Sequence, residues 1–297
     1  MRTYRFVQVD VFAEGPFMGN PLAVFPQAAG LGGEEMQAIA REMNLSETTF
    51  VTPAEGEGHV RVRIFTPEEE LPFAGHPSVG TACELVRLGV VRAVEPVTHV
   101  VLELGVGPRT VDVEVRGALP VAGTVHQGAP IFGAPVQAGA AAGVLGLSED
   151  DIDGELGAQV VGTGLDYVII PLRRQDALAS IVLDLARMTT FEREYGEVYP
   201  FAFTGRDDPW AEARGLFPLT GIPEDPATGS AAGPLAAYLA QRGLLKPGER
   251  RTLLQGMRIG RPSKMTLQVV GSAQDMTDVL VGGGVVPMLS GELTLAG

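Results

Sequence analysis

The sequence holds few of the residues that build disulfides, metal centres or polyanion-binding surfaces. Cysteine occurs once in 297 residues, as Cys83, and histidine four times. One thiol forms no internal disulfide, and no Cys/His cluster has the spacing of a zinc site, so we expect no metal. Asp and Glu outnumber Lys and Arg by 36 to 22, a formal charge of −14, which argues against nucleic-acid and anionic membrane partners.

Long apolar runs are also missing. No run reaches the roughly 18 residues that a membrane helix needs. The opening residues, MRTYRFVQVD, alternate like a strand and lack the apolar core of a signal peptide. We therefore expect a protein of the cytoplasm without a membrane partner.

What is present is typical of a globular protein rich in strands. Hydrophobic residues make up 45% of the chain and charged residues 20%, which excludes bulk disorder. The 39 glycines and 22 prolines fit many short strands joined by turns. The length suits two domains of ordinary size or one large domain.

Alternation and apolar spacing predict a coarse order of elements. Strands are predicted over 3–12, 20–26, 47–52, 59–66, 98–104, 110–116, 166–171, 197–204, 265–270 and 278–286. Helices are predicted over 33–44, from a Gly-His-Pro break to about residue 88, over 176–188, and over 228–242. The stretch 117–145 is rich in Ala, Gly and Pro with almost no charge, so we place a domain boundary near its start. The domains are 1–118 and 119–284, with the last strand, 285–297, a candidate for return to the first.

A short repeat suggests that the two domains are related. PSVGTA at 77–82 and PATGSA at 226–231 lie 149 residues apart, about half the chain. Each opens the most apolar helix of its half. The pattern favours a duplicated domain in which strands wrap around one central helix.

The two helix starts are candidate anion sites. A helix N-terminus offers unpaired N–H groups and about half a positive charge, and small residues let an anion approach. Two such starts facing each other across a domain cleft would hold a small carboxylate. The plain alternative is that each is only a glycine- and proline-rich helix entry.

Glu47 and His76 are candidates for proton chemistry. Glu47 lies in LSETTFV, and a carboxylate there serves as a general base if burial raises its pKa. Spacing alone does not distinguish Glu47 from Glu42 or Glu70. His76 precedes Pro77 and is either a hydrogen-bond donor in the cleft or a structural histidine. The other three histidines have no obvious partners in the sequence.

Asp225 and Ser230 flank the start of the second helix. Asp225 is either a helix cap or a functional carboxylate, and Ser230 is at least a polar residue of the first turn.

Several other kinds of site are excluded, because the chain has no phosphate-binding Walker loop and no Gly-x-Ser-x-Gly elbow. The glycine motifs at 105–110 and 162–167 open no helix, and a two-thiol racemase needs a second cysteine.

Five segments in a fixed order resemble the PhzF-like family of phenazine biosynthesis. The specific signals within them are GNPLAVF, SETTFV, GHPSVGTA and EDPATGSA. The full segments are VDVFAEGPFMGNPLAVF (9–25), NLSETTFV (44–51), FTPEEELPFAGHPSVGTA (65–82), GIPEDPATGSAAGPLAAYL (221–239) and QGMRIGRPSKM (255–265).

The resemblance implies an α+β fold like that of diaminopimelate epimerase. Two pseudo-symmetric domains would each wrap a curved, mostly antiparallel sheet or barrel around a central helix, with the active site between them. It also implies a homodimer without a cofactor. The family's best-known activity is isomerisation of trans-2,3-dihydro-3-hydroxyanthranilate, in which a proton moves between carbons of a ring that carries a carboxylate.

Matched residue by residue, the resemblance assigns roles to seven positions. Glu47 is the expected acid/base, and His76, Asp225 and Ser230 position the substrate or handle protons. The remaining substrate-binding positions are Asn20, Gly75 and Gly229. In the two-thiol relatives the catalytic cysteines lie at the entries of the two central helices, where the matched positions here are Gly75 and Asp225.

The preferred hypothesis is therefore a cofactor-independent isomerase or epimerase that acts on a small carboxylate. A non-catalytic protein that binds small carboxylates on the same fold is the alternative. An enzyme of this fold that carries out another proton-driven step, such as elimination, is a third. Retention of Glu47 favours an enzyme, because a protein that only binds would be free to lose it.

Overall fold

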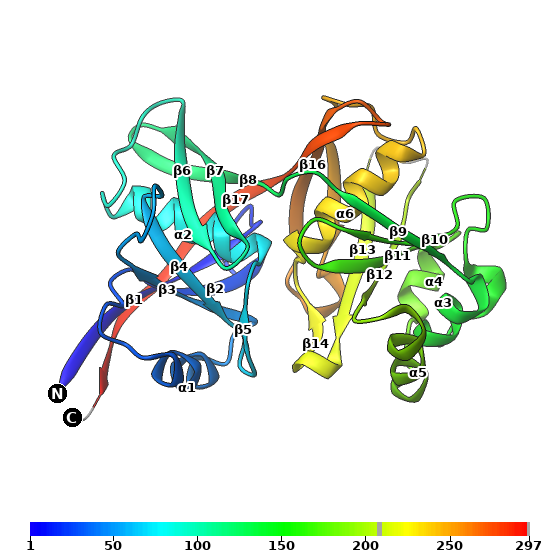
Figure 1. Ribbon diagram of the computed structural model, residues 1–297, viewed down its shortest axis with the longest axis horizontal. Coiled ribbons are helices and arrows are strands. Elements are labelled where there is room, and N and C mark those ends of the chain that lie inside the picture. The colour runs from blue at the N-terminus through cyan, green and yellow to red at the C-terminus, as the bar shows by residue number, and fades with distance from the viewer. Residues whose placement is uncertain (207–209, 296–297) are drawn as a thin grey trace. The chain divides into compact units, whose positions relative to one another are not determined.

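The computed structural model describes residues 1–206 and 210–295, and contacts divide the chain into two units (Figure 1). The N-terminal unit takes in Met1–His126, Gly260–Lys264 and the chain from Val281 onward. The C-terminal unit takes in Gln127–Ile259 and Met265–Leu280. No helix among the described residues is long and apolar enough to cross a membrane.

This division differs from the predicted boundaries. The predicted boundary after residue 118 is eight residues early, because the strand β8 (Leu119–His126) pairs with β7 (Gly107–Arg116) and so stays in the N-terminal unit. The return of the chain starts at 281, before the predicted 285. A second return, 260–264, was not predicted. Its Arg261 donates to the carboxylate of buried Asp10 at 2.6 Å, within the N-terminal unit.

The N-terminal unit is a sheet that closes around one helix. β1–β2, β3–β4, β6–β7 and β7–β8 pair antiparallel, while β2–β3 and β4–β6 are parallel. β17 pairs with both β1 and β8, which closes the ring. The remaining bounds are β1 (Arg2–Val11), β2 (Asn20–Phe25), β3 (Glu47–Thr52), β4 (Val60–Phe65), β5 (Glu70–Leu71), β6 (Val97–Leu104) and β17 (Met276–Leu295), with helices α1 (Gly33–Met43) and α2 (Gly75–Arg87).

The helix α2 is the core of this barrel. All of its residues from Gly75 to Val86 are buried, and it contacts β1, β2, β3, β6, β7 and β8. Gly80 lets α2 pack closely against β1 and β2, because a Cβ there would lie 2.6 Å from Leu22 and 2.7 Å from Val11. A helix that is buried on every side is expected where strands surround it.

Alternation along β3 directs its side chains to two layers. Thr49 faces α2, where its hydroxyl lies 2.9 Å from that of Thr81. Phe50 points the other way and packs in a cluster with Met36 and Ile39 of α1. Glu47 is on the same face as Thr49, so the register of β3 alone brings its carboxylate to the central helix.

The C-terminal unit has the same plan with an added helical layer. β9–β10, β10–β11, β12–β13 and β13–β14 pair antiparallel, and β11–β12 and β13–β15 are parallel. The strands are β9 (Ile131–Val136), β10 (Ala158–Gly162), β11 (Asp166–Pro171), β12 (Tyr199–Thr204), β13 (Trp210–Phe217), β14 (Ile222–Asp225), β15 (Arg251–Gln255) and β16 (Ser263–Gly271). The helices are α3 (Ala138–Leu145), α4 (Gln175–Ser180), α5 (Leu185–Tyr195) and α6 (Gly229–Gln241), with short 3₁₀ turns η1 (Glu149–Asp151), η2 (Pro218–Thr220) and η3 (Met257–Ile259).

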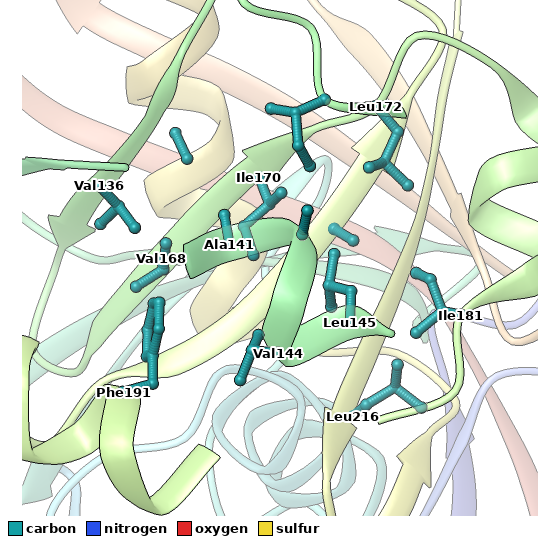
Figure 2. Close-up of a cluster of buried hydrophobic side chains, with 14 of the residues drawn as sticks. Val136, Ala141, Val144, Leu145, Val168, Ile170, Leu172, Ile181, Phe191 and Leu216 are labelled. Carbon is teal, nitrogen blue, oxygen red and sulfur yellow. The ribbon is translucent and has the colours of Figure 1, made fainter. Parts of the chain in front are cut away.

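Helices cover both faces of the sheet in this unit. Val168 and Ile170 of β11 pack in the cluster built from α3, α4 and α5 (Figure 2). Tyr167 points to the opposite face, where its hydroxyl lies 2.7 Å from that of Ser230 in α6. The helix α6 is buried from Gly229 to Ala240, as α2 is in the other unit. The predicted α+β class, with strands around a central helix in each half, is confirmed.

Most predicted elements are present, and the exceptions have local reasons. The strands predicted at 47–52 and 166–171 match β3 and β11 at both ends. The helix predicted at 176–188 is two helices, because Ile181 leaves helical geometry and Asp184 caps a new start by accepting the N–H of Arg187. The strands β5, β10, β13, β14 and β15 were not predicted, nor were β8, β9 and α3 within 117–145.

Candidate active site

Each buried helix begins with a glycine, but neither begins at the proline of the hexapeptide repeat. α2 begins at Gly75, two residues before Pro77, and α6 begins at Gly229, three residues after Pro226. The matched hexapeptides are therefore out of register with the helices by five residues. Both helices span 13 residues, and both N-cap residues, Ala74 and Thr228, lack a capping side-chain bond.

The start of α2 leaves two backbone donors for a ligand. First-turn N–H groups have no acceptor inside their helix. The N–H of Ser78 donates to the carbonyl of Ala74, and Pro77 has no N–H. The amides of Gly75 and His76 remain, at the positive end of the helix dipole, as donors for an anion.

Glu47, His76 and Asn20 come together beside this helix start. The carboxylate oxygen Oε2 of Glu47 lies 3.4 Å from Nε2 of His76, and Nδ1 of His76 lies 3.3 Å from the amide nitrogen of Asn20. Glu47 begins β3, Asn20 begins the adjacent strand β2, and His76 is the second residue of α2. All three side chains are buried, with Glu47 9% exposed.

The imidazole of His76 is held neutral. Burial lowers the pKa of His76 from its ordinary value to about 3, because desolvation disfavours the charged ring. An amide nitrogen only donates, so Nδ1 accepts from Asn20 and the single ring proton is assigned to Nε2. Nε2 faces Oε2 of Glu47 at 3.4 Å, although the pair lacks the geometry of a hydrogen bond. His76 thus places a neutral imidazole beside the carboxylate of Glu47.

The structure distinguishes Glu47 from Glu42 and Glu70, the two other glutamates that the sequence allowed as the general base. Glu42 is exposed on α1. Glu70 is 42% exposed at its side chain and forms an ion pair with Arg63 at 2.6 Å. Glu47 is buried and faces a histidine, which is the arrangement of an oriented general base.

Asp225 ends β14 three residues before the N-cap of α6. One of its carboxylate oxygens, Oδ2, accepts a hydrogen bond from the hydroxyl of Thr228 at 2.7 Å. Thr228 in turn contacts the side-chain amide of Gln255 through its hydroxyl at 2.9 Å and its N–H at 3.1 Å. The interpretation of Asp225 as the cap of this helix is wrong, because the N-cap residue is Thr228.

Ser230 and Gly229 form the first turn of α6. The hydroxyl of Ser230 lies 2.7 Å from that of Tyr167, and the carbonyl of Gly229 accepts from the side-chain amide of Gln127 at 2.8 Å. Sequence reasoning did not identify Tyr167, Gln127 or Gln255. The available signal for Gln255 was its place at the head of the segment QGMRIGRPSKM.

The positions matched to the two catalytic thiols are not equivalent in the structure. Gly75 is the first residue of α2, whereas Asp225 lies outside α6. The residue of α6 that corresponds to Gly75 is Gly229. The one cysteine, Cys83, is buried within α2, and desolvation raises its pKa well above the ordinary value, so its thiol is inert.

The three remaining histidines all have a partner. Nδ1 of His99 lies 2.6 Å and Nε2 of His126 lies 3.1 Å from the carboxylate of Asp112. Nδ1 of His59 accepts the N–H of Val101. Across 1–206 and 210–295, no group of three or more His, Cys, Asp or Glu side chains is arranged to hold a metal ion.

Comparison with known proteins agrees with these motifs. The sequence model of the PhzC-PhzF family, described as phenazine biosynthesis-like protein, matches residues 9–291. Trans-2,3-dihydro-3-hydroxyanthranilate isomerase of Pseudomonas fluorescens is 37% identical over 292 residues, which cover 98% of this chain and 100% of that protein.

Solved structures give the same relationship. A predicted epimerase from Pseudomonas aeruginosa superposes with a TM-score of 0.87 at 36% identity, over 99% of this chain and 100% of that one. A PhzF-family phenazine biosynthesis protein from Bacillus anthracis gives a TM-score of 0.85 at 26% identity with the same coverage. The expected family, epimerase-like fold and isomerase class are confirmed.

Proposed function

We propose, since the chain belongs to the PhzC-PhzF, phenazine biosynthesis-like family of isomerases, that it moves a proton between two carbons of a small, conjugated carboxylate. Glu47 is the acid/base group of this reaction. The first substrate to examine is trans-2,3-dihydro-3-hydroxyanthranilate, on which the similar Pseudomonas enzyme is named to act.

The buried contact between Glu47 and His76 is the observation that carries this proposal. A C–H bond close to a conjugated system is only weakly acidic, so a base must be desolvated and held in place to remove its proton. Glu47 is buried, and the neutral ring of His76, fixed by Asn20, lies beside its carboxylate with Nε2 3.4 Å from Oε2.

The proposed reaction balances without a redox step. The carboxylate of Glu47 takes the proton as the C–H bond breaks, and the electron pair moves into the conjugated system of the substrate. The carboxyl group of Glu47 then returns the same proton to a different carbon. General acid/base help of this kind is worth about 10²–10⁴-fold, and orientation and electrostatics supply the rest.

The helix starts are proposed to hold negative charge. The amides of Gly75 and His76 in the N-terminal unit, and those of Gly229 and Ser230 in the C-terminal unit, each lie at the positive end of a helix dipole. Such preorganised donors stabilise a carboxylate or a developing anion. Asp225 is proposed as the second proton-handling group, and Asn20 and Ser230 as substrate-binding groups.

Incubation with trans-2,3-dihydro-3-hydroxyanthranilate in D₂O, followed by proton NMR, tests the proposal. We expect rearrangement with deuterium incorporated at carbon. Glu47→Gln keeps the size of the side chain but removes the base, so turnover should fall by at least roughly 10²-fold.

Glu42→Gln is the matched control, because Glu42 is an exposed glutamate five residues away. It should retain wild-type turnover. Turnover by Glu47→Gln close to that of wild type would show that another group is the base. Binding of the compound without rearrangement by the wild-type protein would favour the non-catalytic carboxylate-binding alternative.

We further propose a homodimer in the cytoplasm. Leu88, Val90 and Leu289 are 46%, 48% and 50% exposed and line one groove of about 710 Å³ in the N-terminal unit. Large apolar side chains gathered in one place favour a protein contact, and a second copy is the partner that the family resemblance implies. Sedimentation velocity tests this, since a single species of about 31 kDa would contradict it.

A further inference from the structure

We propose that Gln255 is a positioning residue that sets the direction of the Thr228 hydroxyl and so holds the carboxylate of Asp225 in place. The inference rests on the proposed function, in which Asp225 handles a proton. Neither the motifs nor the comparisons assign a role to Gln255. All three residues belong to the C-terminal unit.

Every polar atom of the Gln255 side chain is used at this one place. Gln255 ends β15 and is fully buried. Its Nε2 donates to the backbone carbonyl of Asp225 at 2.8 Å and to the hydroxyl oxygen of Thr228 at 2.9 Å. Its Oε1 accepts the backbone N–H of Thr228 at 3.1 Å. One amide therefore joins the end of β14 to the N-cap of α6.

The hydrogen bonds have only one consistent direction. A hydroxyl carries a single proton. Because the oxygen of Thr228 accepts from Gln255, its own proton is directed to Oδ2 of Asp225, 2.7 Å away. The series runs from amide to hydroxyl to carboxylate. Removing the amide frees the hydroxyl to rotate, and the carboxylate loses a fixed donor.

The surrounding backbone leaves room for this hydroxyl. Gly215 of β13 pairs with Asp225 of β14, and a Cβ at Gly215 would lie 2.5 Å from the hydroxyl oxygen of Thr228. A side chain at position 215 would therefore displace the hydroxyl. Thr228 does not cap α6 with its side chain, so this hydroxyl does not serve the helix.

Gln127 provides a matched control in the same unit. It is also a buried glutamine at the start of α6, with its amide donating to the carbonyl of Gly229 at 2.8 Å and its carbonyl accepting from Thr163 at 2.7 Å. Both of its polar side-chain atoms are thus engaged away from the Thr228 hydroxyl. Replacing either glutamine by leucine removes a buried amide from this helix start. An effect on Asp225 is expected only when Gln255 is replaced.

The first experiment compares Gln255→Leu with Gln127→Leu in the full-length protein, measuring Tm, kcat and KM. Both changes remove a buried amide, and we expect both to lower Tm. Gln255→Leu should lower kcat by about 10- to 100-fold with a smaller change in KM, since the Thr228 hydroxyl is then free to rotate away from the charged carboxylate of Asp225. Gln127→Leu is the control for the loss of Tm, and the two variants are told apart at Asp225 itself by the substrate-free measurement below.

Gln255→Glu adds a readout that a purely structural role would not produce. A protonated glutamic acid has one O–H, which is able to donate to the Thr228 hydroxyl oxygen, whereas an ionised one only accepts and turns the Thr228 hydroxyl toward itself and away from Asp225. Activity of Gln255→Glu should therefore fall as pH rises through ionisation of the introduced carboxyl group. The pH–activity profiles of wild type and Gln255→Leu should both lack this falling limb. Absence of that limb would overturn the proposal.

A substrate-free measurement separates this inference from the assignment of the reaction. Carbon-13 NMR follows the carboxyl of Asp225 through its titration, with Asp225→Asn used to assign the resonance. In Gln255→Leu the midpoint should move upward by about one pH unit, because the hydroxyl that donates to the charged form is no longer held in place. In Gln127→Leu it should stay at the wild-type value.

The outcomes are distinguishable. If the Asp225 midpoint moves but no protein rearranges the test compound, the positioning role stands and the proposed substrate fails. If the midpoint is the same in wild type, Gln255→Leu and Gln127→Leu, Gln255 serves only to stabilise the fold and the inference is wrong.

Discussion

The start of α2 in the N-terminal unit and the start of α6 in the C-terminal unit have the same backbone plan and different chemistry. α2 carries His76, Cys83 and Glu84 and has Glu47 beside it. The sequence of α6, GSAAGPLAAYLAQ, contains no acidic or basic residue, and its start is surrounded by amides and hydroxyls around one carboxylate, that of Asp225. Acidic and basic side chains on the central helix are therefore a property of the N-terminal unit.

The difference shows how one architecture supports two kinds of site. A buried histidine stays neutral and directs one proton, which suits a partner that must accept and release a proton. Amides and hydroxyls do not titrate near neutral pH, which suits a carboxylate held in a fixed geometry. Three changes, from the largest expected effect to the smallest, would break or sharpen this comparison.

The largest effect is expected from glycine to alanine changes in the two central helices. A Cβ at Gly233 of α6 would lie 2.0 Å from Oε1 of Gln127, which would break the buried bonds of that amide. We expect Gly233→Ala to cost about 3 kcal/mol of unfolding free energy. Gly80→Ala in α2 meets only methyl groups of Leu22 and Val11 at such close range and should cost less, about 1–2 kcal/mol.

Urea unfolding of the two variants measures these costs. The helix propensity gained by replacing glycine is the same in both, so the difference between them reports the neighbours alone. An equal or larger loss for Gly80→Ala would show that the amide of Gln127 moves aside freely. The close packing of amides against α6 would then be unimportant for stability.

The next effect is a loss of stability at mildly acidic pH that originates at His76. Its pKa is about 3 when folded, whereas an exposed histidine in the unfolded chain titrates near 6.5. Between these values the unfolded state binds more protons, so the free energy of unfolding falls as pH falls below 6.5. From pH 7 to pH 5 the His76 contribution should fall by about 2 kcal/mol.

Urea unfolding of wild type and His76→Gln at both pH values checks this. Glu84, whose pKa burial raises, is present in both proteins, so its opposite contribution cancels in the comparison. His99→Gln serves as a control because that ring is 71% exposed at its side chain. The same pH dependence in wild type and His76→Gln would contradict a neutral, buried imidazole.

The smallest effect concerns the hydroxyl pair between β3 and α2. Thr49 and Thr81 are fully buried, and their hydroxyls lie 2.9 Å apart. Thr81→Val should cost about 1 kcal/mol, because it leaves the Thr49 hydroxyl with only the 3.4 Å contact to the carbonyl of Ala23. The double variant Thr49→Val/Thr81→Val should recover part of that loss, as thermal unfolding would show.

Much of the fold followed from local pattern. Strands with alternating or continuous apolar residues, such as β3 and β11, were predicted with correct ends because the pleat fixes which side chains are buried. The segment 117–145 was missed because its strands β8 and β9 and the helix α3 are short and rich in Ala, Gly and Pro. Elements of that kind form only because neighbouring strands pair with them.

The candidate site was also predicted in part and missed in part. Glu47, His76, Asp225 and Ser230 were identified from three motifs. The structure brings Glu47, His76 and Asn20 together in one unit and Asp225, Gly229 and Ser230 in the other. The hexapeptide repeat was assigned the wrong register, because helix starts depend on where the preceding strand ends. Sequence spacing does not record that.

The sequence by itself determined the family, the α+β class and the identity of the glutamate motif, because these depend on residue types in a fixed order. Only the tertiary structure decided which of Glu42, Glu47 and Glu70 is buried beside a histidine, which ring nitrogen of His76 carries its proton, and that Gln255 contacts Thr228 and Asp225. Burial and hydrogen-bond direction are properties of groups that meet from distant parts of the chain. No local pattern specifies them.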